Sequence, residues 1–152
     1  MRRLLMILTM LAAACSSLPP ASPAIAPGTP EFDIQATVLA AFNVVSGPAG
    51  RRDWNRFKEL FAPNARIVIN GAAMTPDDYQ KSMNDELQKN ALFEHPLSEK
   101  IERAGDTATL SCRWEARRAA LDEKPFAQGT GEFRLVRSGD RWLIASMQLD
   151  RE

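Results

Sequence analysis

The chain has 152 residues, with 19 basic and 19 acidic side chains, one histidine and two cysteines. This length accommodates one domain with one sizeable hydrophobic core and excludes a second domain. The balanced charge lacks the concentrated basic face that nucleic-acid binding requires, so we expect no nucleic-acid partner. No group of His, Cys, Asp and Glu has the spacing of a metal site, and we expect neither a metal nor another cofactor.

Residues 1–15 are typical of a bacterial export signal. Arg2 and Arg3 supply a positive start, an apolar run follows over residues 4–11, and three alanines then precede Cys15. The apolar run is shorter than the roughly 20 residues that a membrane-spanning helix needs. We therefore expect export to the periplasm or cell envelope.

The three alanines and Cys15 together resemble the lipobox of bacterial lipoproteins. In that motif the cysteine is acylated and becomes the new N-terminus, so the resemblance implies lipidation of Cys15 and attachment to a membrane. Lipoboxes usually carry leucine three positions before the cysteine, whereas here Leu11 lies four before it. Cleavage by ordinary signal peptidase, which would release a soluble exported protein, is the alternative.

A proline-rich tether over residues 16–30 separates this signal from the domain. The segment holds five of the ten prolines and no charged side chain. Such a composition favours an extended, unstructured spacer. We therefore place the folded domain at residues 31–152.

Three helices are predicted ahead of the main sheet. The first has Thr29 as its cap and ends at residues 46–48, and the second is a short helix over residues 52–61. A strand over residues 65–69 follows. The third helix begins at the capping box of Thr75 and extends to about Asn90.

The last third of the chain predicts an antiparallel meander. Apolar and polar side chains alternate strictly over residues 107–117, which predicts a strand with one solvent-exposed face and one packed face. Glu115 falls on the exposed face. The packed face carries Ala108, Leu110, Cys112, Trp114 and Ala116. Two further strands are predicted over residues 131–137, with Phe133 and Leu135 inward, and over residues 141–149. The predicted order is helix, helix, strand, helix and four strands.

The first of these four strands, over residues 92–103, contains Pro96, which indicates an edge strand or a bulge. Alternation places His95 on a common face with four neighbours: Phe93, Leu97, Glu99 and Ile101. Four residues of strand span about 13 Å, so His95 and Glu99 cannot hydrogen-bond directly. The sequence therefore does not support this pair as an acid and base.

Cys112, on the packed face, is predicted to be a small buried hydrophobe. A disulfide between Cys15 and Cys112 is the alternative in an oxidising compartment.

Four stretches carry a resemblance to a known family. They are Arg-Asp-Trp-Asn-Arg-Phe-Lys-Glu-Leu-Phe-Ala-Pro-Asn-Ala-Arg (52–66), Phe-Glu-His-Pro (93–96), Ile-Glu-Arg-Ala-Gly-Asp (101–106) and Gly-Asp-Arg-Trp-Leu-Ile (139–144). With the order of elements, they resemble the nuclear-transport-factor-2-like, or SnoaL-like, superfamily. The resemblance implies a cone-shaped, cystatin-like α+β fold, in which three N-terminal helices cover a bent, mostly antiparallel sheet.

The same resemblance implies either binding or catalysis, because the superfamily includes isomerase-like, dehydratase-like and cyclase-like enzymes as well as members without known activity. Family enzymes use a carboxylate or a His/Asp pair, often with a tyrosine. His95 and Tyr79 are the weak candidates here, since the inward meander positions carry no acid or base. We favour a binding or scaffold domain without a catalytic site. A dehydratase or isomerase that uses His95 or Tyr79 as acid or base is the alternative.

Large, mostly apolar side chains are the candidate ligand-binding residues: Trp54, Phe57, Tyr79, Met83, His95, Trp114, Phe133 and Trp142. They line a pocket for a small apolar ligand if the helices stand away from the sheet, and otherwise they fill the cone. A homodimer through the outer sheet face is a further expected association.

Overall fold

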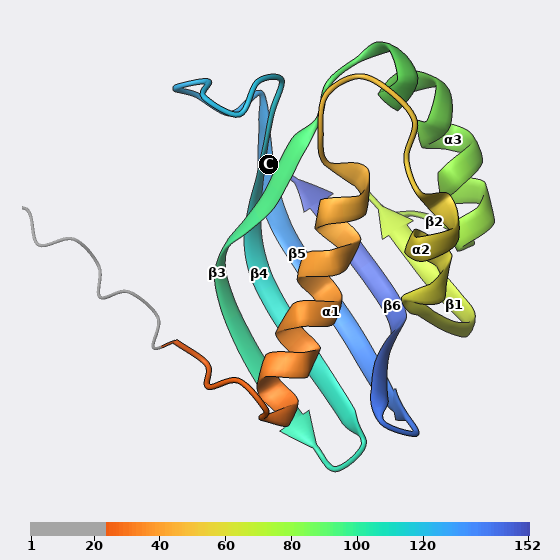
Figure 1. Cartoon of the computed structure of the whole chain (residues 1–152), viewed down its shortest axis with the longest axis vertical. Helices are drawn as coiled ribbons and strands as arrows, with labels where there is room; N and C mark the ends of the chain where they lie inside the picture. The colour runs from red at the N-terminus through yellow and green to blue at the C-terminus, as the bar shows by residue number, and fades with distance from the viewer. Residues whose placement is uncertain (1–23) are drawn as a thin grey trace, which may run out of the picture.

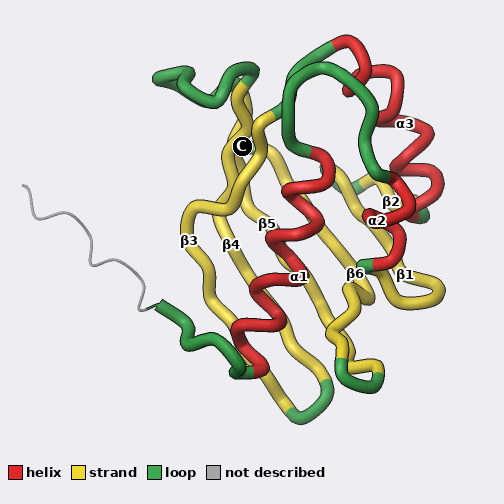
Figure 2. Tube along the Cα trace, in the orientation of Figure 1, coloured by secondary structure: helices red, strands yellow, loops and turns green. Residues whose placement is uncertain are grey.

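The computed structural model describes residues 24–152 of the chain (Figures 1 and 2). The predicted export signal, Cys15 and most of the predicted tether lie outside these described residues. The helices are α1 (Pro30–Val45), α2 (Trp54–Glu59) and α3 (Pro76–Lys89). The strands are β1 (Phe61–Ile69), β2 (Ala72–Met74), β3 (Phe93–Ala104), β4 (Thr107–Arg117), β5 (Ala127–Ser138) and β6 (Arg141–Arg151).

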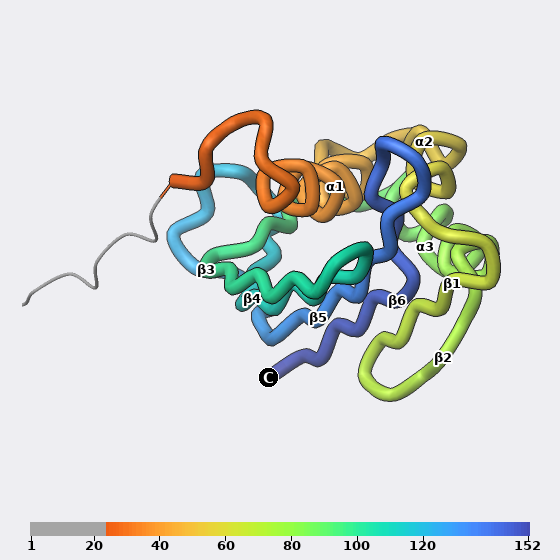
Figure 3. Tube along the Cα trace, turned by 90° about the horizontal axis from the view of Figure 1, so that it is seen from below, coloured from red at the N-terminus to blue at the C-terminus, as the bar shows by residue number. Residues whose placement is uncertain are grey.

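The strands form one six-stranded sheet in the order β2-β1-β6-β5-β4-β3. The pairing of β1 with β6 is parallel, and every other neighbouring pair is antiparallel. Seen from below, the helices lie on one side of the sheet and leave its other side uncovered (Figure 3). This arrangement confirms the predicted α+β class and the mostly antiparallel sheet with helical cover.

Local sequence signals determine where the helices begin. The Thr29 hydroxyl accepts a hydrogen bond from the Phe32 amide, and the Thr75 hydroxyl accepts one from the Asp78 amide. A proline follows each threonine, at a position where a helix does not need an amide donor. Both predicted caps are therefore confirmed.

The region between α2 and α3 differs from the prediction. The short strand β2 was not predicted, α2 is shorter than residues 52–61, and β1 begins at Phe61 instead of residue 65. Pro63 and Asn64 resemble a loop in the sequence, and Asn64 has a φ of 63°. Parallel pairing of Phe61 with Ile144 nevertheless carries the strand through this irregular stretch.

The meander supplies much of the core. All five side chains predicted on the packed face of β4 are buried, as are Phe133 and Leu135 of β5. Cys112, which is 7% exposed, is buried as predicted. The prediction that Glu115 is exposed to solvent was wrong. Its side chain faces away from the helices, but the residue is only 7% exposed because neighbouring polar side chains cover it.

A bulge in β3 reverses the faces of its two halves. Pro96 pairs with Trp114 and Ser98 pairs with Arg113, so Leu97 is an extra residue without a partner in β4. Consequently His95 lies opposite Glu115, on the outer face, whereas Glu99 lies opposite the inward Cys112. The prediction that His95 shares a face with Glu99 and Ile101 was therefore wrong.

Candidate functional site

The cone between the helices and the sheet is closely packed. Its internal cavity has a volume of about 10 Å³, which is about the space for one water molecule. Side chains from three helices and three strands line the cavity: Ala41, Phe42, Val45, Phe57, Tyr79, Glu94, Phe133, Met147 and Leu149. In this conformation the apolar side chains fill the cone, which is one of the two arrangements that the sequence allowed.

Aromatic rings hold one wall of the cavity in place. Phe57 of α2 stacks on Tyr79 of α3 with 5.4 Å between ring centroids. Trp54 meets both rings edge-on, at 5.6 and 6.3 Å, and its indole nitrogen donates a hydrogen bond to the Asn84 side chain. These contacts fix the position of Tyr79 relative to the cavity.

Glu94 of β3 is the acidic residue of the cavity. Ser46, at the end of α1, holds it in place: the Glu94 amide donates to the Ser46 hydroxyl at 3.0 Å, and that hydroxyl donates to the Glu94 carbonyl at 2.8 Å. Burial raises the pKa of the Glu94 carboxyl to about 7. Burial, and then the nearby charge of Glu94, also raise the pKa of Tyr79. The cavity thus combines an acid that titrates near neutral pH with a neutral phenol.

The structure brings only some of the candidate ligand-binding residues together. Phe57, Tyr79 and Phe133 line the cavity. Trp54 is buried beside them, and Met83 packs against the same core. The other two tryptophans are buried elsewhere in the core, where Trp114 donates its indole hydrogen to the Thr130 carbonyl oxygen at 3.0 Å.

His95, the remaining candidate, lies outside the cone. Its Nε2 is 3.1 Å from Oε1 of Glu115, which also accepts hydrogen bonds from the Arg117 guanidinium. Arg117 in turn donates to the carbonyl of Asp122 in the loop between β4 and β5. This outer cluster connects the end of the sheet to that loop, and His95 does not contact the cavity that Glu94 lines.

Glu94 was missed at the sequence level. With uninterrupted alternation, placing His95 inward necessarily placed Glu94 outward. Pro96 was the available signal, because it indicated a bulge or an edge. The position of the extra residue at Leu97 follows from pairing with β4, which the local sequence does not specify.

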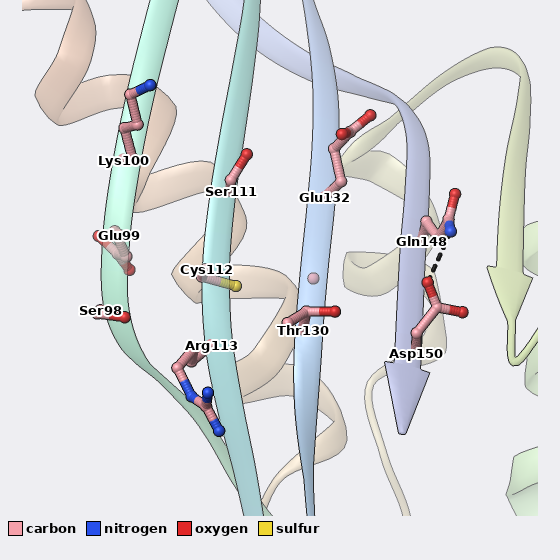
Figure 4. A pocket seen from close by; sticks show the side chains of 11 residues that line it. Ser98, Glu99, Lys100, Ser111, Cys112, Arg113, Thr130, Glu132, Gln148 and Asp150 are labelled. Atoms are coloured by element: carbon pink, nitrogen blue, oxygen red, sulfur yellow. Dashed lines mark hydrogen bonds between the residues drawn. The ribbon is translucent and has the colours of Figure 1, made fainter. Parts of the chain in front are cut away.

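The outer face of the sheet carries a second, shallower depression of about 550 Å³ (Figure 4). Figure 4 shows basic side chains on one half of the depression, Lys100 on β3 and Arg113 on β4, and acidic side chains on the other half, Glu132 on β5 and Asp150 on β6. The side chain of Gln148 donates to Asp150 at 2.7 Å. This surface is polar, and it suits a polar partner better than an apolar ligand.

Neither a cluster of metal-ligating side chains nor a membrane-spanning helix is present in the described residues, 24–152. No group of three or more His, Cys, Asp and Glu side chains there is arranged to hold a metal ion. Within the same residues, no helix combines the length and apolar character needed to cross a membrane.

Comparison with known families gives one match. The family model described as a SnoaL-like domain matches residues 47–148, which include β3 with Glu94 and α3 with Tyr79. No functionally curated protein matches the chain in sequence.

Comparison with solved structures identifies many proteins of the same fold. A protein of unknown function with a cystatin-like fold from Nostoc punctiforme superposes with a TM-score of 0.68 at 10% identity, covering 80% of this chain and 90% of that one. A proposed NTF2-like dehydratase from Streptomyces avermitilis gives 0.65 at 13% identity, covering 82% and 99%. A proposed scytalone dehydratase from Novosphingobium aromaticivorans gives 0.63 at 13% identity, covering 80% and 83%. These similarities confirm the cystatin-like, NTF2-like fold.

Proposed function

We propose a function from the premise that the chain belongs to the SnoaL-like domain family. In this proposal the chain is an exported, membrane-tethered binding domain. Its cone binds a small apolar molecule that carries one hydrogen-bonding group. The observation that carries the proposal is the pair formed by Glu94 and Tyr79 within an otherwise apolar cavity. The export signal and Cys15 support the envelope location.

The polar groups of Glu94 and Tyr79 favour ligand binding because a ligand can form a hydrogen bond with them inside the cavity. A hydrogen bond contributes about 0.5–1.5 kcal/mol in a typical case and about 1.5–3 kcal/mol when one partner is charged. The apolar surroundings of the Glu94 carboxyl raise its pKa, and no side chain among residues 24–152 donates a hydrogen bond to it. A ligand hydroxyl would supply such a hydrogen bond. Because the cavity holds about 10 Å³, such a ligand enters only when α2 and α3 move away from the sheet.

Two bicyclic probes test this proposal: 1-naphthol, which carries one hydroxyl, and naphthalene, which has none. We expect 1-naphthol to bind the full-length chain more tightly than naphthalene, as measured by isothermal titration calorimetry. Replacing Tyr79 with Phe keeps the ring contacts and removes the hydroxyl, and Glu94→Leu removes the carboxyl. Each variant should lower the 1-naphthol affinity by about tenfold, which corresponds to one buried hydrogen bond. Equal affinity for the two probes would contradict the proposal.

A second candidate function is acid–base catalysis, which the pKa of about 7 at Glu94 favours. In this mechanism the Glu94 carboxylate removes a proton from carbon next to a ketone, and Tyr79 donates a hydrogen bond to the developing enolate oxygen. His95 does not take part, because it lies on the outer face.

Deuterium exchange distinguishes catalysis from binding. The protein would be incubated in D₂O with 2-tetralone, a bicyclic ketone, and loss of the α-proton signal would be followed by NMR. Catalysis predicts exchange above the buffer rate that Glu94→Gln abolishes and His95→Ala leaves unchanged. Exchange at the buffer rate would leave binding as the function.

A further inference from the structure

A larger cleft lies on the other side of α1 from the cone cavity, between the N-terminal segment 24–29, α1 and β3. Its volume is about 830 Å³, within the range of small-molecule sites, and it shares no lining residue with the cone cavity. In Figure 1 the N-terminal segment leads into α1, which runs beside β3. We name this hollow the α1–β3 cleft.

The walls of the α1–β3 cleft are apolar. Ile25 of the N-terminal segment, Leu39 of α1 and Ile101 of β3 line it, and all three are partly buried. Leu97, the extra residue of the β3 bulge, adds a side chain that is 53% exposed. A ligand with an aliphatic or aromatic group in this cleft would bury part of this apolar surface.

The polar part of the cleft carries a carboxylate. Glu99 faces α1 because of the bulge in β3, and its Oε2 accepts a hydrogen bond from the Gln35 amide nitrogen. Glu31, which also lines the cleft, pairs with Arg103 at 2.8 Å, whereas Glu99 has no basic partner among residues 24–152. Lys100 follows Glu99 in the chain, but it pairs with Glu102 at 2.7 Å.

These groups select for a cation. The Gln35 side chain donates its amide hydrogen to Glu99, and the carbonyl oxygen of the same amide is a second hydrogen-bond acceptor in the cleft. The residues that line the cleft include no lysine or arginine. A half-buried carboxylate and an amide oxygen suit an ammonium group, and they repel a ligand carboxylate.

We propose that the α1–β3 cleft binds a small amphiphilic amine, whose ammonium group pairs with Glu99 and Gln35 and whose apolar body lies against Leu39, Leu97 and Ile101. This site is separate from the cone and does not depend on the function proposed for Glu94 and Tyr79.

Three probes of equal chain length test the proposal: hexylamine, hexanol and hexanoate. Binding to the full-length chain would be measured at pH 7 by isothermal titration calorimetry. We expect hexylamine to bind about tenfold more tightly than either of the others, as a charge-assisted hydrogen bond in a half-buried site predicts. Hexanoate binding as tightly as hexylamine would overturn the proposal.

Point variants locate the site. Glu99→Gln should weaken hexylamine binding about tenfold and change hexanol binding by less than about twofold. Glu102→Gln, on the outer face of the same strand, is the matched control and should change neither. Leu97→Ser should weaken hexylamine binding without affecting the fold, because Leu97 is already half exposed. Unchanged hexylamine affinity in Glu99→Gln would overturn the assignment.

One more variant separates the two proposals. Glu94→Gln changes the cone cavity and leaves every residue that lines the α1–β3 cleft in place. Hexylamine affinity should therefore be the same in Glu94→Gln and the wild type. A tenfold loss in this variant would show that the amine binds in the cone, and it would overturn the cleft proposal.

Discussion

Glu94 places a carboxyl group in surroundings that disfavour its charged form. The side chains beside it in the cavity include Phe42, Phe57 and Phe133, which offer no hydrogen-bond donor to a carboxylate. Burial therefore raises the pKa of the carboxyl from its ordinary value of 4.5 to about 7. Nothing else that lines the cavity titrates in the same range, since burial keeps Tyr79 neutral to still higher pH.

The first prediction concerns the pH dependence of stability. In the unfolded chain Glu94 loses its proton near pH 4.5, whereas in the folded protein it keeps the proton until about pH 7. The stability associated with its neutral form is thus fully present below pH 4.5 and is lost as the pH rises to 7. Over this pH range the free energy of unfolding should fall by about 3 kcal/mol, because each unit of pKa shift corresponds to about 1.4 kcal/mol.

Urea unfolding of the wild type and Glu94→Gln between pH 4 and 8 measures this effect. The variant lacks the titrating group, so its stability relative to the wild type should increase over that interval. Glu102→Gln is a control in which the shift of the pKa has the opposite direction. A hydrogen bond from Lys100 lowers the pKa of the exposed Glu102 carboxyl, whereas burial raises that of Glu94. Parallel pH profiles for the wild type and Glu94→Gln would show that Glu94 does not titrate near 7.

At the scale of single elements, β5 depends on two glycines that let its neighbours approach. A Cβ atom added at Gly129 would lie 1.9 Å from the backbone oxygen of Asp150 in β6. One added at Gly131 would lie 3.0 Å from the sulfur of Cys112 and from Leu149. The sheet is closely packed at both positions, and at Gly129 the obstacle is backbone, which cannot rotate away.

The second prediction follows from that contact. Gly129→Ala should force β5 and β6 apart and lower the free energy of unfolding by about 1–3 kcal/mol, the usual cost of overpacking a folded core. Thr130→Ala, at the next position on the exposed face, is the control and should have an effect below about 0.5 kcal/mol. Thermal and urea melts measure both. Wild-type stability in Gly129→Ala would contradict the close approach of the two strands.

At the scale of the whole molecule, two associations remain predictions. The homodimer was expected through the outer sheet face, and that face is polar, with ion pairs such as Arg134 with Glu132 and Arg113 with Glu152. Burial of such charges contributes little to affinity unless the partner surface complements them. The membrane association depends on Cys15, which lies outside the described residues.

The third prediction concerns this membrane association. If Cys15 is acylated, the wild-type protein should partition into the detergent phase after expression in a bacterial host, and Cys15→Ser should move it to the aqueous phase. A single acyl chain gives only marginal attachment, whereas the several chains of a lipoprotein anchor hold firmly. Cys112→Ser is the control, because Cys112 is buried in β4 and should not affect partitioning. The same detergent fraction in Cys15→Ser and the wild type would contradict lipidation.

The sequence by itself determined the features that depend on nearby residues. Caps at Thr29 and Thr75 predicted the starts of two helices, because a helix start needs a local acceptor for its free amides. Strict alternation predicted β4 and its buried face, because side chains of a strand point alternately to its two sides. The class of the fold followed from these elements.

Only the tertiary structure decided the chemistry of the interior. The bulge at Leu97 arises from the pairing of β3 with β4, and it places Glu94 in the cone, Glu99 in the α1–β3 cleft and His95 outside. Whether the cone is open or filled depends on how closely helices and sheet pack, which no single segment specifies. Register and cavity volume result from contacts between residues far apart in the chain, and local patterns do not encode them.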